Sequence, residues 1–217
     1  MGFLTDAESG RRWFSLVAPT YDQVVSPVFW PERLQREGLD RLALEPDDRV
    51  LDIGCGTGET LAGVDDGETP SHGLDVSRPQ LKTASKKSDL RGAQFVQGDA
   101  HRLPYVDGVF DAVVSVGSIL YWSDPAAVLR EARRVTTPGG RILVMGFNRR
   151  PPSMWNPVEN VQDAINETLF FRYGPEEASA LFRDAGWTSV ENSITGPSWS
   201  PTLVISTTAK KPDDGET

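Results

Sequence analysis

Residues 50 to 58 read VLDIGCGTG, an apolar run that ends in an acid and is followed by a glycine at every second position. Glycines after a strand let the backbone turn sharply and approach a ligand closely. A dinucleotide fingerprint, G-x-G-x-x-G, would need its third glycine where Glu59 stands. A carboxylate there would face a pyrophosphate at a helix N-terminus, which such a terminus does not favour. The pyrophosphate interpretation is therefore weakened, and a turn that only joins a strand to a helix remains the alternative.

Two further acids follow apolar runs. Asp75 stands near the end of HGLDV (72–76), and Asp99 stands in QGDAH (97–101). An acid after the second strand of such a fold can accept both hydroxyls of a ribose, and one after the third strand can accept from an adenine amino group. Together they predict an adenosine pocket that needs no phosphate groove. The alternative is that both acids cap local turns, Asp75 through Ser77.

The elements that must position these residues alternate along the chain. We expect strands at 49–53, 72–76, 93–97, 110–116 and 140–147, and helices at 30–44, 77–88, 124–135 and 175–187. TPGG at 137–140 is expected to break the chain before the fifth strand. This alternation is typical of a doubly wound α/β sheet, in which ligands bind beyond the carboxyl ends of the strands.

The end of the chain departs from this alternation. Two strand-like runs, 188–195 and 202–210, are joined by GPSWSP, which leaves no room for a crossover helix. They must therefore pair antiparallel. The predicted fold is a seven-stranded, mostly parallel sheet that ends in an antiparallel hairpin, in one domain over 1–217 with a tail at 211–217.

Composition limits the partners. The chain has 217 residues and a net charge of -9, which disfavours nucleic acid as a partner. Its single cysteine, Cys55, excludes an internal disulfide, and we expect packing rather than a nucleophilic role for it and no metal site. No signal peptide and no apolar run of membrane-spanning length is evident, so we expect a soluble, cytoplasmic protein.

Four motifs in order resemble the class I S-adenosylmethionine-dependent methyltransferases: D-x-G-x-G-x-G at 52–58, the acid at 75, GDA at 98–100 and PGG at 138–140. The resemblance implies a Rossmann-like methyltransferase fold with S-adenosylmethionine as cofactor. It places the methionine portion over the glycine turn, the ribose at Asp75 and the adenine at Asp99. The cofactor residues that it implies are Tyr21, Asp52, Gly54, Cys55, Gly56, Gly58, Asp75, Val76, Asp99, Ala100 and Ser115.

Three other stretches resemble the prenyl-benzoquinol and, less closely, the menaquinone and ubiquinone C-methyltransferases: 16–34, 117–125 and 193–212. The acceptor that this resemblance implies is an apolar, prenylated quinol, met at most transiently at a membrane surface. The group that would act as base is not matched, because Leu120 and Tyr121 stand where these families usually carry other residues. His101 is our candidate base, since its pKa range suits deprotonation of a phenol.

Two segments outside the motifs are expected to cover the site: an N-terminal helical cover at 1–45, and an insertion at 148–174 rich in large apolar residues. Of the candidates for acceptor contact, Trp30, Tyr121 and Trp122 stand in the stretches nearest the expected methyl group, whereas the others are as readily explained as plain core. These candidates are Trp30, Tyr121, Trp122, Trp155, Phe170, Phe171 and Tyr173.

Other functions remain open from the residues alone. A small-molecule O- or N-methyltransferase would carry the same cofactor motifs, because these motifs say little about the acceptor. A cofactor-binding module without catalysis and an NAD-dependent oxidoreductase are further alternatives. Glu59 and the final hairpin disfavour the oxidoreductase. The sequence leaves the oligomeric state open.

Overall fold

The computed structural model describes residue 30 and residues 32–64, 70–147, 173–195, 204–213 and 215. Tyr21, Trp155, Phe170 and Phe171 lie outside this part of the chain. The described elements are α3 (Glu32–Leu39), η2 (Asp40–Leu42), β1 (Val50–Ile53), α4 (Glu59–Ala62), β2 (Ser71–Asp75), α5 (Arg78–Ala84), η3 (Ser88–Leu90), β3 (Gln94–Gln97), β4 (Phe110–Val116), η4 (Ser118–Tyr121), α6 (Pro125–Val135), β5 (Thr136–Phe147), α8 (Pro175–Asp184), β6 (Thr188–Thr195) and β7 (Val204–Lys210).

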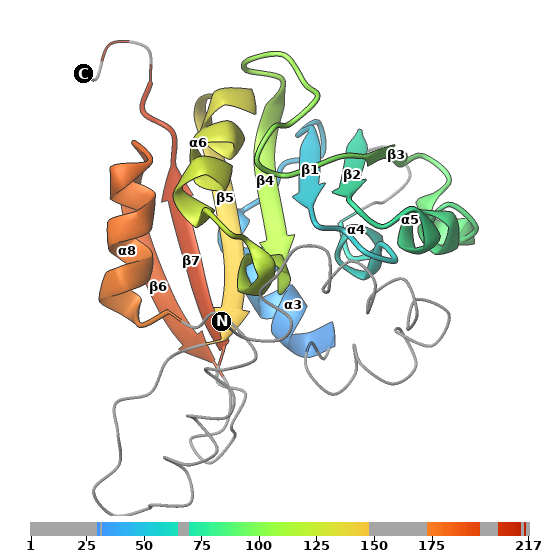
Figure 1. Ribbon diagram of the computed structural model, residues 1–217, viewed down its shortest axis with the longest axis horizontal. Helices are drawn as coiled ribbons and strands as arrows, with labels where there is room; N and C mark the ends of the chain where they lie inside the picture. The colour runs from blue at the N-terminus through green and yellow to red at the C-terminus, as the bar shows by residue number, and fades with distance from the viewer. Residues whose placement is uncertain are drawn as a thin grey trace, which may run out of the picture.

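The strands form one seven-stranded sheet in the order β3-β2-β1-β4-β5-β7-β6 (Figure 1). Strands β1 to β5 are parallel to one another, and β7 runs antiparallel between β5 and β6. The predicted fold class, including the antiparallel hairpin at the end of the chain, is therefore confirmed. The order reverses at β1, which places the ligand-binding edge beyond the ends of β1, β2 and β4.

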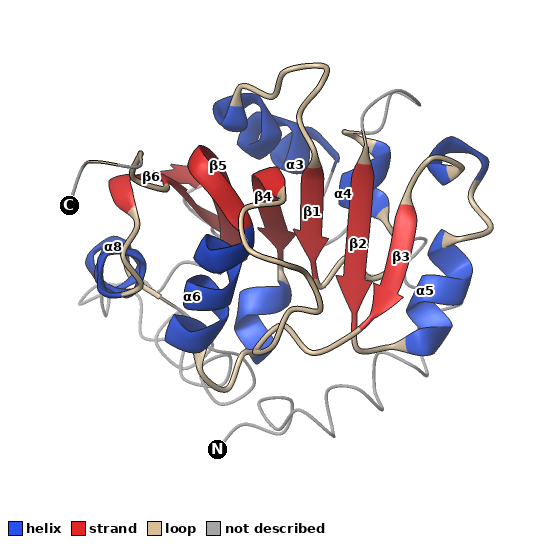
Figure 2. Cartoon of the chain, turned by 90° about the horizontal axis from the view of Figure 1, so that it is seen from above, coloured by secondary structure: helices blue, strands red, loops and turns tan. Residues whose placement is uncertain are grey.

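Burial explains why these runs become central strands. All four residues of β1 are buried, and β4 is buried at five of its seven positions. Continuous apolar runs of this kind suit a parallel sheet that is covered on both faces. Figure 2 shows α6 and α8 on one face and α3 and α4 on the other. The cap of α6 follows its sequence: the carboxylate of Asp124 accepts from the N–H of Ala127 at 2.9 Å, and Pro125 begins the helix.

The largest differences between the predicted boundaries and the structure lie at three places. TPGG does not precede the fifth strand but lies inside β5: Thr136 pairs with Phe110, and the register shifts before Arg141 pairs with Ala112. Gly139, with φ 72°, allows this irregularity. The helix predicted over 30–44 ends as α-helix at Leu39, and the helix predicted over 77–88 ends at Ala84.

The chain stays attached to the sheet at the start of the predicted tail. The N–H of Lys211 donates to the carbonyl of Gly140 at 2.8 Å, and the N–H of Gly139 donates to the carbonyl of Lys211 at 3.1 Å. Lys211, the first residue of the predicted tail, is therefore hydrogen-bonded to β5. Among the helices in the described ranges, none combines the length and apolar character that crossing a bilayer requires.

Candidate active site

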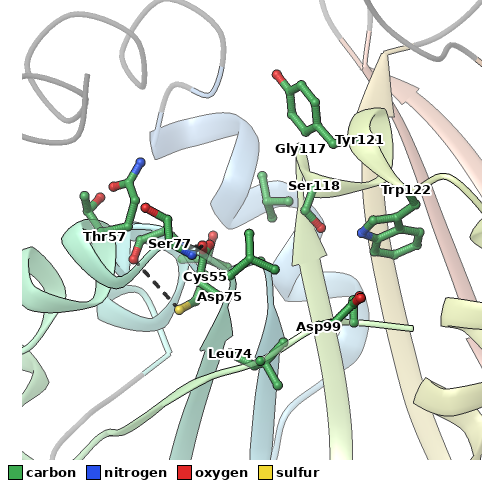
Figure 3. Close-up of a pocket in the computed structure, with 18 of the residues that line it drawn as sticks. Cys55, Thr57, Leu74, Asp75, Ser77, Asp99, Gly117, Ser118, Tyr121 and Trp122 are labelled. Carbon is green, nitrogen blue, oxygen red and sulfur yellow. Dashed lines mark hydrogen bonds between the residues drawn. The ribbon is translucent and has the colours of Figure 1, made fainter. Parts of the chain in front are cut away.

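A cavity of about 750 Å³ opens beyond the carboxyl ends of the parallel strands (Figure 3). Its wall comes from the segments that follow β1, β2, β3 and β4, and from the residues at the start of the described chain. This is the edge of the sheet at which the sequence predicts a ligand. Its lining includes eleven of the predicted site residues: Trp30, Gly54, Cys55, Gly56, Asp75, Val76, Asp99, Ala100, His101, Tyr121 and Trp122.

The glycine turn uses its own amides to hold itself together. The N–H groups of Gly54 and Cys55 both donate to the carbonyl of Leu74, at 2.7 and 3.1 Å, and the N–H of Gly56 donates to Asp75 Oδ2 at 2.9 Å. All three glycines of the turn have positive φ, between 54° and 81°. A pyrophosphate site needs such amides free and aimed at the anion. Here they are engaged, and one already holds a carboxylate, so the turn is not built for a phosphate.

Asp75 joins the glycine turn to the start of α5. Its Oδ2 accepts from Gly56, and its Oδ1 accepts from the N–H of Ser77 at 2.7 Å. Burial raises the pKa of Asp75, and the two backbone hydrogen bonds only partly offset that effect. An ionised carboxylate can accept about four hydrogen bonds, so Asp75 keeps acceptor capacity for a ligand that offers two hydroxyls. The local contact to Ser77, which was the alternative for this residue, and exposure to the cavity therefore occur together.

Asp52 lies on β1 and is buried, with 1% of its surface exposed. Neither carboxylate oxygen has a hydrogen-bond partner within the described residues. Burial, with the charge of Asp75 in addition, raises its pKa well above the ordinary value. An unpartnered buried acid is costly in a ligand-free protein. The region around the turn is thus suited to a ligand that carries positive charge.

Cys55 behaves as a packing residue. Its side chain is buried with Leu61, Leu81 and Leu90. Burial, together with the charges of Asp52 and Asp75, raises the pKa of the thiol well above its ordinary value. A thiol in such surroundings is a poor nucleophile, in line with the packing role expected for it.

Asp99 and His101 form a second polar cluster after β3. Asp99 Oδ1 accepts from the backbone N–H of His101 at 2.9 Å and from its ring nitrogen Nδ1 at 2.7 Å. Burial alone would raise the pKa of Asp99, but these contacts with His101 hold it below the ordinary value. On the other side of the ring, Nε2 accepts from the N–H of Asp124 at 3.2 Å. His101 would have to give up that contact before it could take a proton from a substrate, so its candidacy as a base stays a prediction.

The opposite side of the cavity is aromatic. Trp30 is buried, its carbonyl accepts from the side chain of Gln35 at 2.7 Å, and its ring packs so closely on Gly117 that a Cβ there would come within 2.8 Å of it. Figure 3 shows Tyr121 and Trp122 on this side, across the cavity from Thr57 and Ser77. An aromatic wall of this kind suits a flat, apolar ligand group.

Some predicted site residues lie behind the wall of the cavity. Asp52 is buried beneath the glycine turn, Gly58 is buried within the turn, and Tyr173 packs against the main core. Ser115 is buried in β4, and its hydroxyl lies 2.5 Å from that of Ser118. It is Ser118 that lines the cavity.

Sequence reasoning missed further lining residues. The polar ones include Gln35, Thr57, Thr60, Ser77, Gln80, Gln97, Ser118 and Ser123. A signal existed for Ser118, because Gly117, with φ 76°, turns the chain directly after β4. Gln35 gave a weaker signal as a polar residue on the buried side of α3. Its Oε1 accepts from the hydroxyl of Thr60 at 3.0 Å and so ties α3 to α4.

Comparison with known proteins identifies the family. A family profile described as "Methyltransferase domain" matches residues 51–144. A demethylmenaquinone methyltransferase of Beutenbergia cavernae is 40% identical over 183 residues, which cover 72% of each chain. The chain belongs to the class I S-adenosylmethionine-dependent methyltransferases. S-adenosylmethionine is therefore its cofactor, as the four motifs imply.

A plant relative extends the match. The chloroplastic 2-methyl-6-phytyl-1,4-hydroquinone methyltransferase of Arabidopsis thaliana is 32% identical over 200 residues, 91% of this chain. This methyltransferase chain spans 57% of the length of that relative. Among solved structures, the [4+2]-cyclase SpnF superposes with a TM-score of 0.75 at 21% identity, over 96% of this chain and 98% of its own. That likeness shows the shared fold alone.

The charges around the cavity fit this cofactor. No lysine or arginine is among its lining residues in the described ranges, whereas Glu59, Asp75 and Asp99 are. S-adenosylmethionine carries a sulfonium and an ammonium group, which acidic surroundings stabilise. Asp52 is buried and neither of its oxygens has a hydrogen-bond partner among the described residues, so an ionised Asp52 would add to the same field. A Cβ on Gly56 would meet no atom within 4 Å, so the turn leaves open space for a ligand. Within the described residues no group of three or more histidine, cysteine or acidic side chains could hold a metal ion.

Proposed function

We propose that this methyltransferase adds a methyl group to a ring carbon of a prenylated quinol. The observation that carries the proposal is the similarity to the hydroquinone methyltransferase of Arabidopsis thaliana over 91% of this chain. The demethylmenaquinone methyltransferase of Beutenbergia cavernae shares 40% identity with this chain over 183 residues. Both relatives are named for aromatic quinol or quinone acceptors.

The contacts proposed for the cofactor follow from the polar groups of the cavity. Asp75 would accept both ribose hydroxyls, Asp99 would accept from the adenine amino group, and the glycine turn would lie against the methionine portion. When bound, S-adenosylmethionine supplies a methyl group that is already activated. The protein then contributes mainly alignment of the acceptor with that methyl.

The acceptor would lie on the aromatic side of the cavity. Trp30, Tyr121 and Trp122 line this side and offer flat, apolar surface for a quinol ring. The hydroxyl of Ser118 donates to the carbonyl of Ile53 at 2.9 Å, and its remaining lone pair could accept a hydrogen bond from a quinol hydroxyl. Ser118 would orient the ring rather than remove a proton.

The proton balance of the reaction decides which form of the acceptor reacts. Ring carbon becomes a good nucleophile once a neighbouring hydroxyl has lost its proton, and the ring proton leaves after the new carbon–carbon bond has formed. A quinone has no such hydroxyl. The reduced quinol should therefore be methylated, and the oxidised quinone should not.

The test is a labelling experiment with an unfractionated acceptor pool. The protein is incubated with methyl-labelled S-adenosylmethionine and a membrane lipid extract, kept reduced with dithionite or left oxidised. We expect label in a quinone band of the reduced sample alone. Label in that band regardless of redox state would contradict the ring-carbon mechanism.

A matched variant and a second extract complete the design. Asp75→Ala should abolish most of the labelling, because it removes the proposed ribose contact and leaves the aromatic side unchanged. A cytosolic extract of polar small molecules is run in parallel. Label confined to that extract would overturn the quinol proposal and favour the alternative, O- or N-methylation of a small molecule.

A further inference from the structure

His101 connects two segments near the cavity through one imidazole ring. Its Nδ1 lies 2.7 Å from Asp99 Oδ1, and its Nε2 lies 3.2 Å from both the backbone nitrogen of Asp124 and the hydroxyl oxygen of Ser123. Asp99 follows β3, whereas Ser123 and Asp124 lead into α6. The ring therefore spans two segments that are more than twenty residues apart in the chain.

These partners fix the tautomer of the ring. A backbone N–H can only donate, so Nε2 must accept from Asp124 and carries no proton in the neutral ring. The single proton of the neutral imidazole is then on Nδ1, where it donates to Asp99. The second hydrogen bond of a histidine commonly decides which nitrogen is protonated in this way.

The hydrogen bonds on Asp99 are unequal between its two oxygens. Both donors of His101, the backbone N–H and the ring N–H, converge on Oδ1, and Oδ2 has no partner within the described residues. The Asp99 side chain is 67% exposed and that of His101 only 28% exposed. An exposed carboxylate rotates freely unless neighbours hold it, and here the backbone N–H and the more enclosed imidazole of His101 each hold the same oxygen by one hydrogen bond.

We propose that His101 is a positioning residue that holds Oδ1 of Asp99 and so keeps Oδ2 turned toward the adenine amino group of the cofactor. This inference rests on the adenine contact proposed for Asp99. It gives one of the two histidines of the chain a role in cofactor selectivity, through Asp99 and without contact with the reacting atoms. Anchoring at Asp124 keeps the ring from following Asp99 outward.

The test compares two ligands that differ at the amino group. S-adenosylhomocysteine carries the 6-amino group, and S-inosylhomocysteine carries an oxo group in its place. Calorimetry gives both dissociation constants for each variant, and the readout is their ratio. Because the ratio is taken on one sample, partial unfolding of a variant leaves it unchanged. A purely structural role for His101 would weaken both ligands alike and leave the ratio at its wild-type value.

Two substitutions distinguish the roles of the two ring nitrogens of His101. The amide of His101→Asn can still donate to Asp99 at the place of Nδ1, whereas the longer side chain of His101→Gln carries its amide at the place of Nε2. We expect the wild-type protein to prefer S-adenosylhomocysteine by about tenfold to hundredfold, the range for a hydrogen bond to a charged group. His101→Gln should reduce this preference by about two- to tenfold. His101→Asn should retain more of it than His101→Gln does.

A third variant, Asp99→Asn, distinguishes failure of the positioning role of His101 from failure of the adenine contact of Asp99. Loss of the preference in Asp99→Asn, with an unchanged preference in His101→Gln, would overturn the positioning role and leave the adenine contact intact. An unchanged preference in Asp99→Asn would overturn the adenine contact and the inference with it. An equal loss in His101→Gln and His101→Asn would also overturn it, because the donor to Asp99 would then not be the cause.

Discussion

Replacing Asp52 by asparagine should stabilise the ligand-free protein at neutral and alkaline pH. The carboxyl is buried, neither oxygen has a partner in the described part of the chain, and Asp75 adds a like charge nearby. Ionisation of Asp52 is therefore opposed by burial first and by Asp75 second. Asparagine keeps the shape of the side chain and removes the charge.

The sign of the pH dependence follows from the direction of the shift. The pKa of Asp52 in the folded protein is raised above 3.8, the ordinary value. Its contribution to stability is fully present below that ordinary pKa and is lost as the pH rises through the folded pKa. The wild-type protein should therefore lose stability over this range relative to Asp52→Asn, and the two should be nearly equal near about pH 4.

The size of the effect can be estimated from the missing hydrogen bonds. A buried polar group left without a partner costs about 1–3 kcal/mol, and a charged one costs more. The asparagine amide is also polar, but its burial costs less than that of a charge. For a chain of this size 1 kcal/mol corresponds to about 2–4 °C in Tm, so the variant should gain roughly 2–12 °C near pH 8.

The assay is thermal unfolding followed by circular dichroism between about pH 4 and about pH 8. Asp89→Asn, at an exposed site in η3, is the matched control, and its Tm should change with pH as that of the wild type does. Adding S-adenosylmethionine should reduce the difference in Tm between Asp52→Asn and the wild type, because the cationic ligand stabilises an ionised Asp52 and binds the variant less well. A difference in Tm between wild type and Asp52→Asn that does not change with pH would refute the reasoning.

Two further substitutions test the walls of the cavity. Asp75→Ala leaves the N–H groups of Gly56 and Ser77 without their acceptor, and calorimetry should show a loss of about tenfold to hundredfold in affinity for S-adenosylhomocysteine. An unchanged affinity in a folded variant would contradict the assignment. Gly117→Ala combines strain at φ 76° with a Cβ only 2.8 Å from the ring of Trp30, so tryptophan fluorescence should change and Tm should fall. Gly108→Ala has a similar positive φ and no atom within 4 Å, and an equal loss of Tm in both would show that the Trp30 contact contributes nothing.

The fold was predictable because it depends on local patterns. The strand at 110–116 was predicted with the bounds that the structure gives, since a continuous apolar run marks a central parallel strand. The start of β5 was missed for the opposite reason. Thr136 and TPGG are held in the sheet by Phe110 and by the chain near Lys211. These are long-range contacts, and the local sequence does not indicate them.

The candidate site was predictable in part, for the same reason. Residues at strand ends, such as Asp75 and Asp99, could be assigned to the cavity from the order of the strands alone. Gly117 indicated a turn after the fourth strand, but the sequence does not give its φ of 76°, and this angle decides that Ser118 rather than Ser115 faces the cavity. The neighbour of Gly117 is Trp30, far away in the chain, so the aromatic wall depends on tertiary packing.

The two halves of the cavity therefore depend on different features of the structure. The cofactor half is built from backbone amides and from acids that follow directly after strands, where the fold itself fixes their positions. The aromatic half is built from side chains brought together across the chain, as Trp30 is with Gly117. The ring of His101, between Asp99 and Asp124, joins a proposed cofactor contact to the segment that follows the aromatic residues, so a change in cofactor selectivity at that residue would be a sign that the halves are coupled.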